Sequence, residues 1–94
     1  MGAATGEGQA VSVVDVSDRS VGYVLEGPRA IEVIEAGCPR DVRKLAVGAA
    51  VRTVWEGVEI VLLREGEARY VVEVWRSFAP WLELAFRTAA KSLR

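Results

Sequence analysis

The sequence predicts an α+β domain in which a small antiparallel sheet of about four to five strands packs with two main helices. Short valine-rich segments separated by turn residues are typical of strands. The segment 78–93 repeats apolar residues at helical spacing. Hydrophobic residues make up 51% of the 94 positions, which is enough for one compact core. We expect a single domain over residues 10–94, in the order βββαββα, preceded by a flexible N-terminal tail at residues 1–9.

The first two strands are expected at residues 10–16 and 21–26. The first of them, AVSVVDV, is dominated by valine, whose branched side chain fits a pleated sheet. The short polar residues at 17–20 suit a turn, because such side chains bond to the local backbone. Gly27 and Pro28 then end the strand pattern.

Residues 29–36 (RAIEVIEA) fit two different structures. Four apolar residues lie within about 160° on a helical wheel, and Pro28 suits the start of a helix. The Ile-Val-Ile content instead favours a strand. We favour the strand, because a clear helix is predicted to follow directly over residues 39–55.

The helix predicted over 39–55 is apolar on two sides. Pro39 suits its first turn, and Asp41 complements the positive end of the helix dipole. Its two apolar stripes are Val42, Leu45, Ala46 and Ala49, and Val47, Val51 and Val54. A helix of this kind is expected to lie between two layers.

Residues 58–76 predict a hairpin that is apolar on both faces. A three-residue loop centred on Gly66 would place Val58, Ile60 and Leu62 opposite Val74, Val72 and Tyr70. These residues form the expected core face. The second face carries Val61, Val71 and Trp75, so it requires cover from a helix, a second copy of the chain or a ligand.

The last helix is expected at residues 78–93. Its apolar stripe consists of Trp81, Leu82, Ala85, Phe86, Ala89 and Leu93. Ser77 can cap its start, and Pro80 fits the first turn.

Catalytic chemistry is poorly supplied in this chain. It contains no histidine and only one cysteine, Cys38, and Ser17, Ser20 and Ser77 fall in turns or caps. We therefore expect no enzymatic activity, no metal site and no cofactor. No apolar run is long enough to span a membrane, and residues 1–9 lack the features of a secretory signal, so a cytoplasmic protein is expected.

Nucleic-acid binding is the most specific function that the residue types support. Single-strand binders stack bases on aromatic side chains and pair phosphates with arginine, without a sequence motif. Arginine outnumbers lysine ten to two, and residues 39–94 carry ten basic and seven acidic residues, a net charge of +3. The predicted contact residues are Arg43, Arg52, Trp55, Arg64, Arg69, Trp75 and Arg76. The alternative for Trp55 and Trp75 is that they fill the core beneath the last helix.

Self-association is a further expectation, because the apolar surface exceeds what a chain of this length readily buries. A homodimer is compatible with binding single-stranded DNA or RNA. It is also compatible with the competing function, that of a dimeric adaptor or a subunit of a protein complex with no nucleic-acid role.

The arrangement of Trp55, Arg69, Trp75 and Arg76 on a small sheet with flanking helices resembles the ThermoDBP-related single-stranded DNA-binding proteins of thermophilic archaea. The single glutamine and absence of asparagine also suggest a thermophilic source. The resemblance implies sequence-independent DNA binding in a cleft, and oligomerisation. Over IEVIEAGCPRDVRKLAVGAAV the chain also looks slightly like the archaeal chromatin protein Alba.

Overall fold

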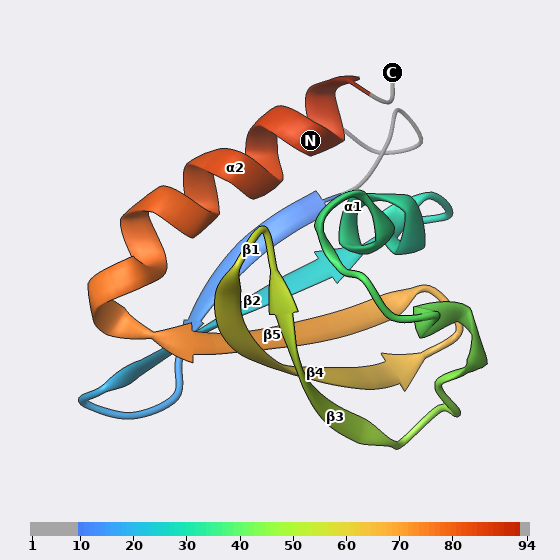
Figure 1. Cartoon of the computed structure of the whole chain (residues 1–94), viewed down its shortest axis with the longest axis horizontal. Helices are drawn as coiled ribbons and strands as arrows, with labels where there is room; N and C mark the ends of the chain where they lie inside the picture. The colour runs from blue at the N-terminus through green and yellow to red at the C-terminus, as the bar shows by residue number, and fades with distance from the viewer. Residues whose placement is uncertain (1–9, 93–94) are drawn as a thin grey trace.

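The computed structural model describes residues 10–92 and contains a five-stranded antiparallel sheet with two α-helices (Figure 1). In chain order the elements are β1 (Ala10–Asp15), β2 (Ser20–Glu26), α1 (Ala30–Gly37), β3 (Ala50–Trp55), β4 (Val58–Gly66), β5 (Arg69–Trp75) and α2 (Ala79–Ser92). Two short 3-10 turns, η1 (Val42–Lys44) and η2 (Arg76–Phe78), precede β3 and α2. The strands lie in the order β1-β2-β5-β4-β3. The predicted α+β class is confirmed, and the expected tail at 1–9 lies outside the described residues.

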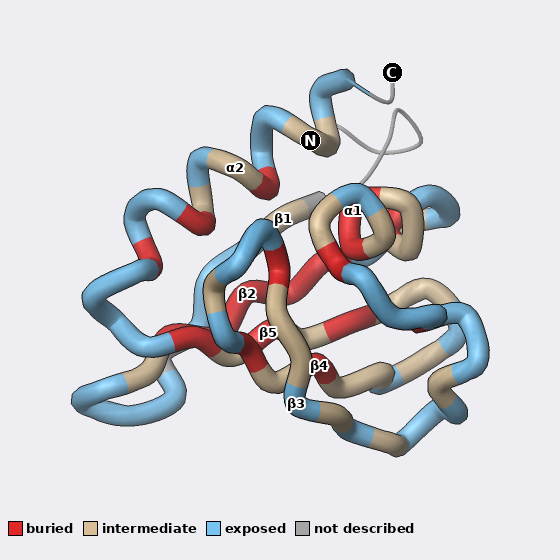
Figure 2. Tube along the Cα trace, viewed as in Figure 1, coloured by how far each residue is buried: buried red, intermediate tan, exposed pale blue. Residues whose placement is uncertain are grey.

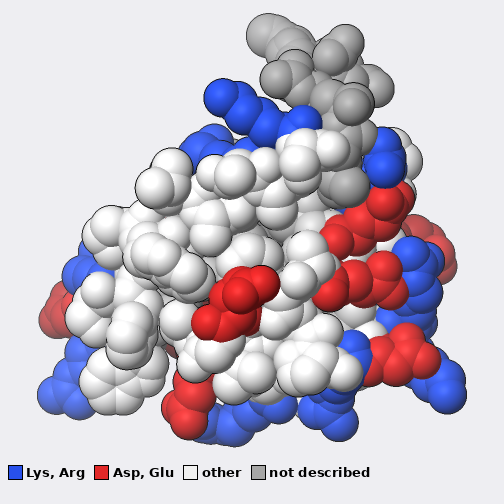
Figure 3. Space-filling model, turned by 45° about the horizontal axis from the view of Figure 1, so that its top comes forward, with Lys and Arg blue, Asp and Glu red and all other residues white. Residues whose placement is uncertain are grey.

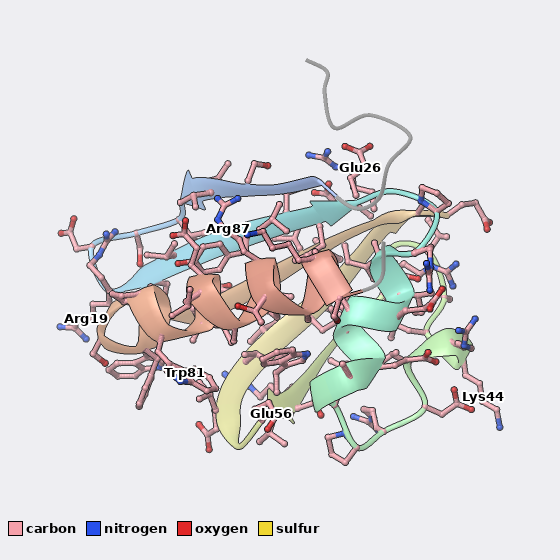
Figure 4. The ribbon with its side chains drawn as sticks, turned by 90° about the horizontal axis from the view of Figure 1, so that it is seen from above. Arg19, Glu26, Lys44, Glu56, Trp81 and Arg87 are labelled. Carbon is pink, nitrogen blue, oxygen red and sulfur yellow. The ribbon has the colours of Figure 1, made fainter. Side chains whose placement is uncertain are left out.

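Both α-helices lie on the same side of the sheet, as the two ribbon views show (Figures 1 and 4). The core fills the space between them and the sheet, where the buried stretches of α1, α2 and the central strands meet (Figure 2). Phe86 is central to it, with its ring edge-on to the rings of Tyr23 and Trp55. The Tyr23 hydroxyl donates a hydrogen bond to the Ala79 carbonyl at 2.9 Å, which ties β2 to the start of α2.

The strands predicted at 10–16 and 21–26 are confirmed as β1 and β2. The helix predicted at 78–93 is confirmed as α2, and residue 93 lies outside the described residues. Between the two strands, the Ser17 hydroxyl accepts hydrogen bonds from the backbone N–H groups of Arg19 and Ser20, both at 3.2 Å. This is the local bonding expected of short polar side chains in a turn.

The strand favoured for 29–36 and the helix predicted over 39–55 are both wrong. The first segment forms α1, with Ala30, Val33 and Ile34 buried at helical spacing. In the second, η1 is followed by Gly48 at a φ of 91°, which interrupts a right-handed helix. Residues 50–55 (AVRTVW) then alternate between the two sides of the sheet as β3. The order is therefore ββαβββα.

The hairpin of β4 and β5 is confirmed, but its predicted register is wrong by two residues. Leu62 pairs with Val72 instead of Tyr70, and the turn lies at Glu67 and Ala68. A bulge between Arg64 and Gly66 adds one residue to β4, and this restores the alternation that a two-residue turn alone would have shifted. The expected core face is therefore kept.

Candidate binding surface

The second face of the sheet, here called the open face, is not covered by either helix (Figure 4). Alternation along the strands places Gly22, Val24, Arg52, Val54, Val61, Leu63, Val71, Glu73 and Trp75 on this face. Trp75 is 60% exposed. The sequence correctly indicated a hairpin with two apolar faces, and the helices cover only one of them.

A cleft of about 320 Å³ opens on this face beside the turn between β1 and β2. It is lined by Ser17, Arg19, Ser20, Arg52, Glu59, Ile60, Val61, Glu73 and Trp75. Two of the predicted contact residues, Arg52 and Trp75, therefore meet in one cleft. Its two arginines are matched by two glutamates, so the cleft presents mixed charge rather than a positive field.

Further exposed apolar residues follow Trp75 along the chain, where β5 passes through η2 into α2. Phe78, Trp81 and Leu84 are exposed by 49%, 49% and 66%, and these three residues and Trp75 are here called the aromatic corner. Trp81 projects from the first part of α2 (Figure 4), and its ring lies edge-on to Trp55, 6.4 Å between centroids. The helix side of the molecule shows a broad area without charged residues (Figure 3). Single exposed apolar residues are common, but a group of this size is typical of an interface.

Trp55 does not belong to either exposed surface. It is 3% exposed, and its indole nitrogen donates to the Val33 carbonyl at 3.1 Å. The ring packs against α1 at Gly37, where a Cβ would lie 2.5 Å from it. The prediction of Trp55 as a stacking platform is therefore wrong, because its position in β3 turns the indole into the core.

Arg43 and Arg69 are engaged by carboxylates. Arg43 donates two hydrogen bonds to Glu35, at 2.6 and 3.0 Å, and Arg69 bonds to Glu65 and Glu26 at 2.6 and 3.1 Å. The hydrogen bonds to Glu35 are the main cause of a raised pKa at Arg43, and the hydrogen bond to Glu65 is the main cause of a raised pKa at Arg69. Arg43 lies near α1 and Arg69 at the far end of the open face, so neither joins the cleft.

Arg64 and Arg76 bind backbone carbonyl groups. Arg64 donates to the carbonyls of Leu45, Gly66 and Glu67 and lies 5.5 Å from the ring centre of Tyr70. Arg76 donates to the carbonyls of Ser17 and Asp18, at 2.9 and 3.0 Å. Both side chains hold loops against the sheet by hydrogen bonds, and this structural role explains the two arginines without a ligand.

The sequence interpretation included Trp75 but missed the other exposed residues of the aromatic corner, and it missed Arg19 in the first turn. It assigned Trp81 to the buried stripe of the last helix and did not single out Arg19, Phe78 or Leu84. The signal was present, because Phe78, Trp81 and Leu84 recur every third residue and form a ridge separate from buried Leu82 and Phe86.

No group of three or more His, Cys, Asp or Glu side chains among residues 10–92 could hold a metal ion. Cys38 is buried, with its sulfur 3.5 Å from the Thr53 hydroxyl. Within the same range, no helix has the length and apolar character required to cross a membrane.

These features define a small α+β domain with an uncovered sheet face and an aromatic corner. No family model and no curated protein matches the sequence. Among solved structures it is similar to a chain of heterotetrameric sarcosine oxidase from Corynebacterium sp. U-96, in complex with pyrrole 2-carboxylate. The TM-score is 0.78 at 28% sequence identity, over 86% of this chain and 43% of that chain. The chain thus spans less than half the length of the chain it resembles.

Proposed function

We propose that this chain is a non-catalytic subunit of a multi-subunit enzyme related to heterotetrameric sarcosine oxidase, and that the aromatic corner holds it to a larger subunit. The observation that carries the proposal is the exposure of Trp75, Phe78, Trp81 and Leu84 on a fold similar to a chain of that heterotetramer. The cytoplasmic location expected from the sequence is part of the proposal.

The composition of the aromatic corner suits a protein partner. Tryptophan and phenylalanine are enriched in the buried centres of protein interfaces, and tryptophan contributes most strongly to binding energy there. Contact with buried Trp55 and the backbone of α2 holds Trp81 in place before binding, so little side-chain entropy is lost on docking.

The charge distribution also favours a protein partner over a polyanion. The net charge is −1, and four of the arginines predicted to meet phosphates bind carboxylates or carbonyl groups of the chain itself. A sequence-independent nucleic-acid binder draws most of its affinity from basic residues that face the phosphates.

The experiment is to tag the chain in its source organism, purify it under native conditions and measure the mass of the assembly and its sarcosine-dependent oxygen uptake. The proposal predicts a stoichiometric assembly with larger chains that oxidises sarcosine. The double variant Trp75→Ala, Phe78→Ala should no longer bind to this assembly, but its circular dichroism should remain that of the folded chain. Val47→Ala, at another exposed position, is the matched control and should stay bound.

Two results would contradict the proposal. One is a tagged chain that elutes without a stoichiometric partner. The other is an assembly that retains the double variant as well as it retains the Val47→Ala control.

A second candidate, sequence-independent binding of single-stranded DNA or RNA, is supported by one observation. Exposed Trp75 lines the same cleft as Arg19 and Arg52, which is the pairing of indole and guanidinium that single-strand binders use.

This candidate predicts that an oligothymidine quenches tryptophan fluorescence at low salt, that added salt weakens the quenching steeply, and that Trp75→Phe removes most of it. The protein-subunit proposal predicts no quenching at low salt, so one titration separates the two functions.

A further inference from the structure

The two edges of the sheet differ in how they are covered. The end of α1 and the segment after it lie along β3. Arg40 reaches the Arg52 carbonyl at 3.5 Å, and just past the strand the Glu56 backbone donates to the carbonyl of Gly37, the last residue of α1, at 2.8 Å. Cys38 also contacts the side chain of Thr53 on this strand. The β3 edge is therefore screened from another strand.

The β1 edge lacks such cover within residues 10–92. In the sheet formed by residues 10–92, β1 is the end strand and its one neighbour is β2. Val13 and Val14 point to opposite faces and are both 45% exposed, and Val16, just beyond the strand, is 48% exposed. β1 contains no proline and carries a charge only at its last residue, Asp15, whereas charges and proline are the usual means of protecting an edge strand.

We propose that β1 pairs antiparallel with β1 of a second copy of this chain, so that the two sheets become one across a twofold axis. The outer edge of β1 can bind another extended strand, because unpaired backbone N–H and C=O groups repeat along it. A second copy fits because two uncharged segments 10–14 can lie side by side without like-charge repulsion.

Closure of the assembly also favours a second copy. Once the β1 edges have paired, the joined sheet ends at a screened β3 edge on each side, so association stops at two chains. A strand-to-strand contact of this length is small among protein interfaces, so the dimer is expected to form only at higher protein concentration.

The test is sedimentation of the full chain over a series of concentrations. The mass should rise from the 10.2 kDa of one chain to twice that value. Val13→Lys should keep the chain monomeric throughout, whereas Val47→Lys, at a similarly exposed valine away from β1, should dimerise like the wild type. Hydrogen exchange at the β1 amides should slow as the dimer forms.

The proposal would be overturned by a monomer at every concentration, by a dimer that Val13→Lys leaves intact, or by β1 exchange that does not change with concentration. The aromatic corner is a separate surface, so Trp75→Ala with Phe78→Ala should leave this dimer unchanged. The dimer and the proposed enzyme subunit can therefore fail independently.

Discussion

The two faces of the sheet are built from similar residues but differ in how they are covered. The face beneath the helices buries Leu25, Leu62 and Val72 completely, whereas Trp75 on the open face is 60% exposed. Valine, leucine and tryptophan thus support folding on one face and remain available for contact on the other. An apolar strand pattern therefore indicates how much surface must be covered, but not whether the cover comes from the same chain.

The largest expected effect is a difference in stability loss between two phenylalanine variants, one at a buried and one at an exposed position near α2. Phe86→Ala removes a fully buried ring and should lower the free energy of unfolding by about 3–5 kcal/mol. Phe78→Ala removes a ring that is 49% exposed and should change it by about 0.5 kcal/mol or less. Chemical denaturation of both variants measures the difference, and equal losses would contradict the assignment of core and surface.

A smaller effect is expected where the core face is tightly packed. Gly37→Ala would place a Cβ 2.5 Å from the buried Trp55 ring and should destabilise the fold by about 1–3 kcal/mol. Gly66→Ala is the matched control, since its new Cβ would lie 3.8 Å from the nearest side-chain atom. A Gly37→Ala variant as stable as Gly66→Ala would show that Trp55 does not pack against α1 in this way.

The smallest of these effects concerns the hydrogen bond that joins β2 to α2. Tyr23→Phe keeps the ring but removes the bond to the Ala79 carbonyl, and the free energy of unfolding should fall by about 1 kcal/mol. Tyr70→Phe is the matched control, because it removes a hydroxyl from another buried tyrosine of the same face. Thermal denaturation near neutral pH compares the two, and a Tyr23→Phe loss no greater than that of Tyr70→Phe would contradict the role of the bond.

Alkaline pH should act on the same residue. Burial raises the pKa of Tyr23, and the neighbouring Glu83 raises it further. At a pH below about 10, the ordinary pKa of tyrosine, the side chain is protonated in both the folded and the unfolded chain. Above it the unfolded chain releases the proton more readily, so stability should fall as the pH rises past about 10 and should fall less in Tyr23→Phe. A stability that rises in this range would contradict the burial of the hydroxyl.

Much of the fold could be predicted from the sequence, because alternation in β1 and β2 and helical spacing in α2 are strong local signals. The exchange of helix and strand between residues 29 and 55 could not. The residue types of segment 29–36 favour a strand, but their spacing suits a helix. The helix forms because its buried side packs against Trp55 and the sheet. The hairpin register depended on a bulge near Gly66, which no local pattern marks.

The candidate site was predicted only in part. Arg52 and Trp75 do meet in a cleft, because both lie on the open face. Side-chain type alone could not distinguish an arginine available to a ligand from Arg64, which binds three backbone carbonyl groups. Nor could it show that Trp55 would be buried while Trp81 remains half exposed.

The most direct test of a subunit held by its aromatic corner is hydrogen–deuterium exchange of the chain inside its purified assembly, compared with the free chain. We predict slower exchange across residues 75–84 in the assembly, with little change in β4. Equal exchange rates for 75–84 in the two forms would show that the partner, if bound, docks elsewhere, and would contradict the account.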